Sequence, residues 1–473
     1  DDLLAALLER VDPATDALLV VAPVAPAGAP ELAVALLQAP GVDGGVLRSP
    51  TTRRDGYIQL ADLAPSVLAL LGEDQPSEIE GRAVEVRPAT RSERVGDLAD
   101  GARRAELRDD LMPVIVPIVI GALAVLLAAA VVARRTGRSW RRALAIGALV
   151  GLVVVPATFA VSRAADVVDT IWAFVLAVAV VSAAGGLALW VAVRRRPEVG
   201  ALVGTGAIVV LFVVDVLAGA RLQVNAVFGY SVAVAGRFAG LGNLAFALFG
   251  AATVVLAALV VERYGRRGVP WAIGLLVTVV LIEGLPMLGA DVGGVLSMVP
   301  AFGVTGLLLA GRRVGLREAA ALAVGAVAAV LAFAFVDAAR PDGSQTHLAR
   351  LAEHLVEGRW GQFSDSLTRR LQASFGGAEL AAWAAVVALG LAVAAYVVLA
   401  ARGRIDPALR PHVARPPRTA AIAGLLVLAT VGLVANDSSI AVPATMLIVV
   451  VPVGVLRAIA EPSVAPSVDM GRA

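Results

Sequence analysis

The apolar residues of this chain are gathered into runs of about twenty, and this grouping limits what it can fold into more than any other feature. A helix needs roughly 20 consecutive apolar residues to cross about 30 Å of hydrocarbon. Of the 473 residues, 59% are hydrophobic, which exceeds the share in ordinary soluble domains. We therefore expect an integral membrane protein, mainly α-helical, built as a polytopic bundle.

Eleven segments have the length and composition of a membrane-spanning helix, and together they predict a bundle over residues 111–457. The expected spans are 111–133, 143–161, 170–193, 199–219, 242–261, 270–289, 292–311, 318–338, 379–401, 419–435 and 440–457. We find no internal repeat, and eleven spans do not divide into equal halves. Both points weigh against a transporter built from two inverted repeats.

The distribution of arginine predicts how the bundle is oriented. The chain has no cysteine, and all 40 of its basic residues are arginine. Alternate short links, at 134–142, 194–198, 262–267, 311–317 and 401–418, carry 5, 3, 3, 3 and 5 arginines. The other short links, at 162–169, 220–241, 290 and 436–439, carry 1, 2, 0 and 0. Because arginine-rich loops stay in the cytoplasm, we expect a multi-pass plasma-membrane protein with its N-terminal domain outside and its tail, residues 458–473, in the cytoplasm.

The first 110 residues differ in character from the bundle. They contain 11 arginines against 20 acidic residues, a net charge of −9, whereas the remainder carries +11. Short aliphatic runs at 16–23 and 31–41 predict strands of an α/β domain, and 60–71 predicts a helix that Asp62 caps and Gly72 ends. We expect an extracytoplasmic domain over 1–86 and a partly ordered linker over 87–110. Outside the short cytoplasmic loops there is no basic groove, so nucleic acid is not an expected partner.

The run DLAPSVLALLGEDQPSEIEGRAV within this domain resembles the C-terminal signature of the alkaline phosphatase and sulfatase superfamily. The matching positions are Asp62, Ala64, Pro65, Ser66, Leu71, Gly72, Pro76, Gly81 and Arg82. The resemblance covers roughly residues 16–86. It implies the C-terminal part of a truncated, larger domain, with the family's metal ligands and its Ser or Thr nucleophile mostly in a segment upstream of Asp1.

The same resemblance implies a metal-binding histidine near the C-terminal end of the domain, within residues 48–57. That segment reads RSPTTRRDGY and contains no histidine. Either the site is degenerate or the active half lies in the upstream segment. No catalytic residue is therefore carried over, and a divalent metal cofactor is implied only if the upstream segment supplies its ligands. The three histidines, His347, His354 and His412, are spaced too far apart to predict a metal site of their own.

Several polar residues fall at the expected outer ends of the spans, where a buried ionisable group is costly and usually functional. We expect them to converge into one pocket facing the external domain. Glu283 and Asp291 are the candidate catalytic residues, as base or cation ligand, and Arg237 is the candidate phosphate-binding residue. The other candidate substrate-binding residues are Asp215, Asn225, Asn243, Asn436 and Asp437.

Two glycine-dense segments carry most of these residues. Residues 230–242 predict a re-entrant or broken-helix segment, which is permitted only when it is buried in protein or lines a cavity. The glycines of 236–240 and 289–293 would allow close helix approach, or let backbone N–H groups meet an anion. Purely structural alternatives stay open. In these, the glycines serve helix packing, Asn436 and Asp437 cap a helix end, and Arg237 forms an ion pair with Glu283 or Asp291.

The pattern GRFxGxGN followed by GxPxLGAxVGG resembles polytopic envelope proteins of Gram-positive (actinobacterial) bacteria, and this resemblance says little about chemistry. The long external loop 339–378 repeats leucine and phenylalanine at helical spacing. Two amphipathic helices on the outer leaflet, or packing against the external domain, would explain this repeat.

Taken together, these features predict an envelope protein that hydrolyses or transfers a phosphoester on a lipid-linked or anionic precursor at the outer leaflet. A membrane lipid, or a substrate linked to one, is the expected partner. The alternatives are a transporter or flippase for such a precursor, which would need polar residues continuing inward past Glu283, and a non-catalytic membrane scaffold.

Overall fold

A computed structural model gives the structure of the chain over most of its length. It describes residues 5–6, 8–22, 32–42, 44–76, 79, 81–136, 140–164, 168–196, 198–233, 238–341, 345–346, 349, 414–436, 438 and 440–460. The expected span at 379–401, most of the loop 339–378 and the three histidines lie outside these residues.

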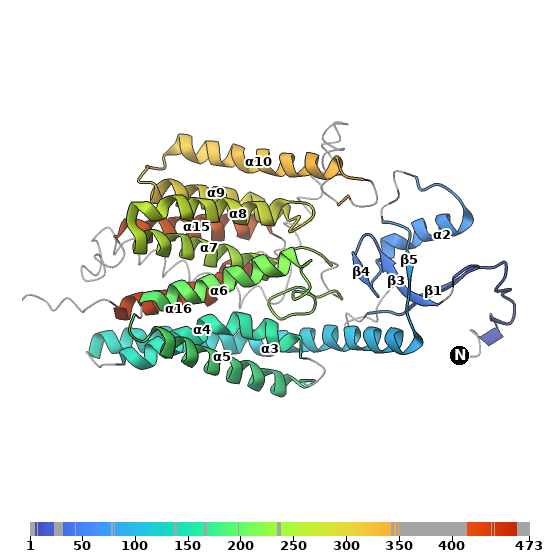
Figure 1. Ribbon diagram of the computed structural model, residues 1–473, viewed down its shortest axis with the longest axis horizontal. Helices are drawn as coiled ribbons and strands as arrows, with labels where there is room; N and C mark the ends of the chain where they lie inside the picture. The colour runs from blue at the N-terminus through green and yellow to red at the C-terminus, as the bar shows by residue number, and fades with distance from the viewer. Residues whose placement is uncertain are drawn as a thin grey trace, which may run out of the picture.

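Long helices dominate the described part of the chain (Figure 1). They are α3 (Arg91–Thr136), α4 (Arg141–Ser162), α5 (Ile171–Val193), α6 (Glu198–Leu217), α7 (Asn243–Tyr264), α8 (Val269–Gly284), α9 (Val292–Leu309), α10 (Leu316–Ala338), α15 (Pro416–Ala435) and α16 (Ala441–Ala460). Within the described ranges, nine segments are long and apolar enough to cross a membrane, and one of these, Asn243–Gly284, comprises α7 and α8 joined by the short helix η2 (Gly265–Gly268). The mainly α-helical, polytopic membrane bundle is thereby confirmed.

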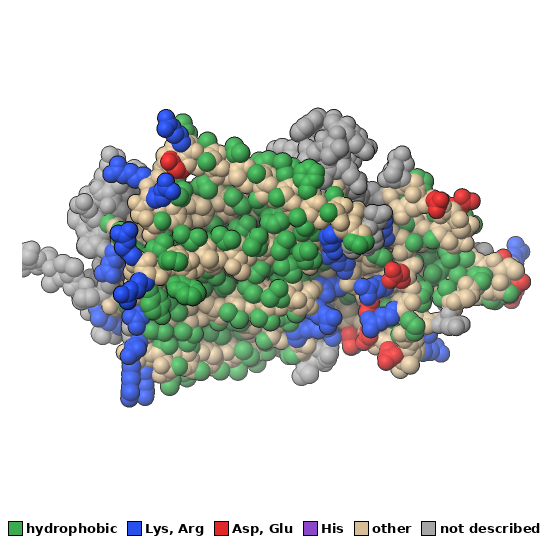
Figure 2. Space-filling view, turned by 45° about the horizontal axis from the view of Figure 1, so that its top comes forward, with side chains coloured by type: hydrophobic (Ala, Val, Ile, Leu, Met, Phe, Trp, Pro, Cys, Tyr) green, Lys and Arg blue, Asp and Glu red, His purple; other side chains and the backbone are tan. Residues whose placement is uncertain are grey.

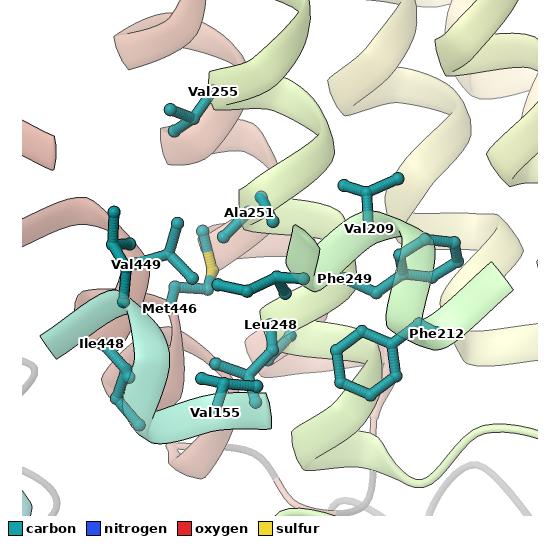
Figure 3. Packing of buried hydrophobic residues seen from close by; sticks show 14 of the residues in the cluster. Val155, Val209, Phe212, Leu248, Phe249, Ala251, Val255, Met446, Ile448 and Val449 are labelled. Carbon is teal, nitrogen blue, oxygen red and sulfur yellow. The ribbon is translucent and has the colours of Figure 1, made fainter. Parts of the chain in front are cut away.

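The helix α7 forms the centre of the bundle. Most of its side chains are buried, and it packs against α6, α8, α15 and α16. The rings of Phe159, Phe212 and Phe249 contact one another in series, the first pair edge to face and the second tilted, with centroids 5.4 and 5.7 Å apart. Figure 3 shows this region as a wholly apolar core to which α4, α6, α7 and α16 contribute. Such close packing holds the helix ends, and the loops between them, in fixed positions.

The two ends of the bundle differ in charge. The links α3–α4, α5–α6, α7–α8 and α9–α10 and the start of α15 lie at one end, which we call the arginine end. The opposite end, beside the strands of the N-terminal domain, we call the domain end (Figure 1). Figure 2 shows apolar side chains covering the surface between an arginine band at the first end and mixed charges at the second.

Exposed aromatic side chains mark both ends of the apolar surface. Tyr264 and Trp271 lie at the arginine end, and Trp172 lies at the domain end. Trp and Tyr concentrate where a protein crosses the lipid headgroup level, because their rings are apolar and their polar atoms are wet. The position of these rings agrees with a membrane around the green surface of Figure 2.

The N-terminal region contains two small antiparallel sheets. The strands β1 (Leu18–Val21) and β2 (Ala35–Gln38) pair with each other, and β3 (Gly45–Ser49) lies between β4 (Arg54–Asp55) and β5 (Glu85–Pro88). The helical turn η1 (Leu60–Asp62) leads into α2 (Leu63–Leu71), which ends at Gly72 with φ +77°. The strands and the helix that the sequence predicts in this region are present.

Asp62 directly precedes this helix, but its side chain does not cap it as predicted, because the carboxylate accepts no hydrogen bond from the first turn of α2. Its buried carboxylate accepts hydrogen bonds from Thr51 Oγ1 at 2.7 Å, from the Gln59 backbone N–H at 2.9 Å and from the Arg82 backbone N–H at 3.0 Å. Ser66 Oγ donates to the Asp62 carbonyl at 2.5 Å and accepts from the Val84 N–H at 3.0 Å. Asp62 and Ser66 therefore tie together the β3–β4 turn, α2 and the segment before β5.

The segment 87–110 differs from the expected linker. After β5 ends at Pro88, α3 begins at Arg91 and continues without interruption to Thr136. Thr90 and Glu93 form a reciprocal capping box, in which Thr90 Oγ1 accepts from the Glu93 N–H and the Glu93 carboxylate accepts from the Thr90 N–H. Such a box stabilises a helix start. One helix of 46 residues, roughly 70 Å long, therefore joins the domain to the bundle.

Candidate functional site

Two loops, non-helical in their described residues, cover the domain end. The first connects α6 to α7, and the second, residues 285–291, connects α8 to α9. Most described residues of the first loop are buried, including the stretch from Asn225 to Val232, and Pro286, Gly289 and Asp291 are buried in the second. The non-helical, buried segment expected over 230–242 is thus seen in its described residues, and 234–237, with Arg237, lie outside them.

The two glycine-dense segments touch each other backbone to backbone. A Cβ placed on Gly240, where φ is +76°, would lie 2.1 Å from the Gly289 carbonyl oxygen. A Cβ on Gly289 would lie 2.3 Å from the Glu283 carbonyl oxygen. No real Cβ tolerates such distances, so the glycines are required by the approach of two loops rather than two helices.

Asp215 and Gln223 hold the first loop against the helices. The Asp215 carboxylate, at the end of α6, accepts from the Leu222 N–H at 2.8 Å and from Gln223 Nε2 at 3.2 Å. Gln223 Oε1 accepts from the Gly242 N–H at 2.9 Å, just before α7. Asp215 therefore takes part in positioning the loop. Gln223 was not among the site residues predicted from the sequence, where the available signal was an amide eight residues after the candidate Asp215.

Asn225 also stabilises the conformation of the first loop. It adopts the left-handed conformation, with φ +55°. Its Oδ1 accepts from the Val232 N–H at 3.3 Å, and its Nδ2 donates to the Gly101 carbonyl of α3 at 3.4 Å. Asn tolerates this backbone conformation better than most residues do, which explains its presence at the turn.

Glu283 and Asp291 lie together at the start of α9. Glu283, in the last turn of α8, is fully buried, and Asp291, at the N-cap of α9, is 4% exposed. The Asp291 N–H donates to the Glu283 carbonyl at 3.1 Å. Glu283 Oε1 lies directly against Gly294, whose absent side chain leaves room for it. Two carboxylates thus flank a helix N-terminus, where negative charge is favoured.

Asn243, at the start of α7, and Asn436, at the end of α15, lie at the same end of the bundle as Glu283 and Asp291. Asn436 Oδ1 lies 3.0 Å from the position that a Gly293 Cβ would take, and its buried Nδ2 has no hydrogen-bond partner among the described residues. Asn243 Nδ2 donates to Ser438 Oγ at 2.7 Å. We call Asn243, Glu283, Asp291 and Asn436 the polar cluster. Asp437 lies outside the described residues.

Two adjacent arginines of the N-terminal domain, Arg53 and Arg54, form hydrogen bonds to these loops. Arg54 Nε donates to the Phe238 carbonyl at 2.8 Å, while Arg54 Nη2 donates to the Gly219 and Ala220 carbonyls at 2.8 and 3.0 Å. Arg53 Nη1 reaches the Pro286 carbonyl on the second loop at 3.4 Å. One short segment of the domain therefore contacts both loops.

Tyr57 adds an apolar contact to this junction. Its ring lies 5.9 Å from the ring of Phe238, and both pack beside buried Tyr230 and Val232. Burial raises the pKa of the Tyr57 hydroxyl, with smaller opposing effects from nearby Arg104, Asn225 and Arg54. The junction is therefore a packed interface and not only a set of polar contacts.

Asp337 anchors the start of the long loop that follows α10. Its buried carboxylate accepts from Arg340 Nη1 at 2.9 Å, from the Thr346 N–H and Oγ1 at 2.7 and 2.6 Å, and from the Ala349 N–H at 3.0 Å. Burial and the charge of Arg340 lower the pKa of nearby Arg53, and Asp337 opposes this. Asp337 was not among the site residues predicted from the sequence, where the available signal was an Asp three residues before an Arg at the end of a span.

Below the polar cluster, the helices offer no continuous polar track in the part of the chain that the structure describes. Ser182 Oγ, buried in α5, has no hydrogen-bond partner among the described residues. Six other buried hydroxyls donate to carbonyls of their own helices, which is the usual way to satisfy them in membranes. These are Thr158, Ser162, Thr205, Thr253, Ser297 and Thr305. Among the described residues, no group of three or more His, Cys, Asp or Glu is arranged to hold a metal ion.

No protein-family model, no curated protein and no solved structure matches this chain. Its function must therefore be argued from the chemistry of the domain end.

Proposed function

We propose that this protein is a membrane-bound enzyme of the cell envelope that hydrolyses or transfers a phosphoester of a lipid-linked or anionic precursor at the outer leaflet. The supporting observation is the contact between residues 48–57 of the N-terminal domain and the loops that cover the polar cluster. Arg54 alone binds three carbonyls of the first loop.

This contact supports the proposal because the superfamily resemblance implies that residues 48–57 lie near the reacting phosphoester. In related proteins this region would carry a late metal ligand, close to the reacting phosphoester. Here its Arg53 and Arg54 side chains face the domain end of the bundle. An active centre beside this region would therefore open toward a substrate anchored in the leaflet beside the loops.

The bundle would hold the substrate in this scheme. Glu283 and Asp291 are buried carboxylates in a protein that crosses the membrane, where such groups are costly and usually functional. We assign them the role of base or cation ligand, with the amides of Asn243 and Asn436 binding the polar part of the substrate. Arg237 is assigned to its phosphate. The arginine distribution supports placing the domain end outside the cell.

The first test is a phosphodiester assay on the full-length protein in nanodiscs with an added divalent metal. One substrate is lipid-linked and the other is a small soluble chromogenic phosphodiester. We expect Arg54→Ala to lower turnover of the lipid-linked substrate at least tenfold while sparing the soluble one, because the domain loses its fixed position over the leaflet. Arg48→Ala is the matched control, since Arg48 is on the same sheet and half-exposed.

A second pair of variants tests the bundle's part. Glu283→Gln and Asp291→Asn keep the side-chain size and remove the charge, so we expect both to reduce turnover of the lipid-linked substrate. If both variants fold and retain full activity, the bundle does not hold the substrate. A folded wild-type protein that hydrolyses neither substrate would overturn the enzymatic proposal.

The non-catalytic scaffold is the second candidate, and one observation favours it. Residues 48–57 contain arginines where the family would place a histidine, and two of them are used for docking. A scaffold would show the same Arg54-dependent docking without any hydrolysis. A transporter is less favoured, because most of the described buried hydroxyls are satisfied within their own helices.

A further inference from the structure

A cleft lies at the domain end between α3 and the start of α5, two helices that run side by side (Figure 1). Its volume is about 490 Å³, within the range of roughly 300–1,000 Å³ that is typical of small-molecule sites. The residues that line it include Arg103, Glu106, Leu107 and Asp110 on α3, and Asp169 and Ile171 on the side of α5.

Both walls of the cleft end where the helices become apolar. Asp110 is the last charged residue of α3 before the apolar run that begins at Leu111, and Asp169 is the last charged residue before α5. Trp172, in the first turn of α5, is 71% exposed, and exposed tryptophan marks the lipid headgroup level. A ligand in the cleft would therefore lie at the level of the headgroups.

The cleft uses a different face of α3 from the one that contacts the first loop. The Gly101 carbonyl and the Asp109 carboxylate accept hydrogen bonds from side chains of that loop. Glu106 and Asp110 line the cleft instead. The cleft is therefore distinct from the polar cluster and from the loops that cover it.

Carboxylates meet in the cleft from both walls. Glu106 and Asp110 are four residues apart on α3, so they are neighbours on its surface, and like charges at this spacing destabilise a helix slightly. Asp169 adds a third carboxylate from the opposite wall. A primary ammonium between them can donate a charge-assisted hydrogen bond to each and offset their repulsion.

Arg103 brings the opposite charge to the same cleft. It forms an ion pair with Asp100, one turn before it, and its side chain remains 72% exposed. Its planar guanidinium matches the oxygens of a phosphate group geometrically. Leu107 and Ile171 add apolar surface to the lining. The cleft thus offers carboxylates, a guanidinium and an apolar contact to a single ligand.

We propose that this cleft binds the headgroup of a zwitterionic phospholipid that carries a primary ammonium, such as phosphatidylethanolamine. The ammonium contacts Glu106, Asp110 and Asp169, and the phosphodiester contacts Arg103. The acyl chains extend into the leaflet beside α5. This inference is independent of the proposed activity, because the cleft and the polar cluster share no residue.

The test measures lipid retention by native mass spectrometry of the full chain, with phosphatidylethanolamine against phosphatidylcholine. Both lipids carry the phosphodiester, but the trimethylated ammonium of phosphatidylcholine donates no hydrogen bond. We expect the wild-type protein to retain phosphatidylethanolamine preferentially. Glu106→Gln and Asp110→Asn should each weaken that binding about fivefold, the size of one exposed charged contact, and leave phosphatidylcholine binding unchanged.

Asp97→Asn is the matched control, because Asp97 is an exposed acid nearer the start of α3 and outside the cleft. It should change the retention of neither lipid. A purely structural role of the cleft carboxylates would instead change thermal stability equally in both lipids and leave the lipid preference intact, which would overturn the proposal. Equal retention of the two lipids by the wild-type protein, or equal losses in Asp97→Asn and Glu106→Gln, would do the same.

Two further measurements identify which group of the lipid is recognised. Arg103→Gln should weaken the retention of both lipids, because both carry the phosphodiester, and an unchanged retention would contradict its assigned contact. The retention of phosphatidylethanolamine should persist in EDTA, since no metal ion bridges the lipid to the carboxylates in this proposal. A loss in EDTA that Ca²⁺ restores, or a preference for phosphatidylglycerol over phosphatidylethanolamine, would contradict recognition of the ammonium.

Discussion

At the scale of single residues, the glycines of the domain end are explained by backbone contacts. Gly240 and Gly289 let two loops meet, and Gly294 leaves room for the Glu283 carboxylate. The sequence shows that these positions are glycines, and the spacing suggested packing of helices. Only the structure shows that carbonyl oxygens occupy the space where side chains would be.

Gly240→Ala should destabilise the folded protein by about 2 kcal/mol or more, because it adds a Cβ beside the Gly289 carbonyl and strains a positive φ. Gly206→Ala is the control, since a Cβ there meets nothing within 4 Å in α6, and alanine favours the helix by up to about 1 kcal/mol. Thermal unfolding in detergent measures both. Equal melting temperatures for the two variants would contradict the loop contact.

Tyr57 should make the docked domain sensitive to high pH. Burial raises the pKa of its hydroxyl in the folded state, so the neutral form is favoured by folding. The stabilisation is complete below the unfolded pKa, about 10, and is lost as the pH rises through the folded value. In a pH titration, we expect a step in phenolate absorbance at a pH above the ordinary tyrosine pKa. This step should be absent from Tyr57→Phe. A step at the ordinary tyrosine pKa would show that the ring is not buried.

At the scale of elements, the Asp62 carboxylate joins pieces that are far apart in the sequence. It binds the β3–β4 turn through Thr51 and the approach to β5 through Arg82. The sequence predicted the helix and its end at Gly72, because these depend on local preferences. It could not predict the contact with Arg82, because twenty residues separate the partners.

Asp62→Asn should destabilise the N-terminal domain by about 1–3 kcal/mol, since an amide NH₂ must face at least one of the donors that the carboxylate now accepts. Hydrogen exchange of β3 to β5 should rise while the bundle stays protected. Asp55→Asn is the matched control, because its ion pairs with Arg48 and Arg87 are surface pairs, worth about 0–1 kcal/mol. Similar exchange in both variants would show that Asp62 is not the anchor.

At the scale of the whole molecule, the two ends of the bundle differ in charge, and this difference predicts which side of the membrane each end faces. The arginine-rich links lie together at one end, away from the N-terminal domain (Figures 1 and 2). The positive-inside rule then predicts that the domain faces outward.

Cysteine labelling in intact cells tests this orientation directly, because the natural chain has no cysteine. Ala14→Cys, exposed in the N-terminal domain, should react with a membrane-impermeant maleimide. Arg313→Cys, exposed in the α9–α10 link, should react only after the membrane is permeabilised. The reverse pattern would invert the topology and remove the outer-leaflet proposal.

The sequence by itself determined the class of the protein and the ends of most spans, because the length of apolar runs and the position of charges are set by the membrane and not by tertiary contacts. It also singled out Glu283, Asp291, Asn243 and Asn436. Only the tertiary structure decided that these four form one cluster, that α3 runs on through residues 91–110, and that Arg54 binds the loops. Each of these depends on groups distant in the chain coming within hydrogen-bond or van der Waals reach, which no local pattern encodes.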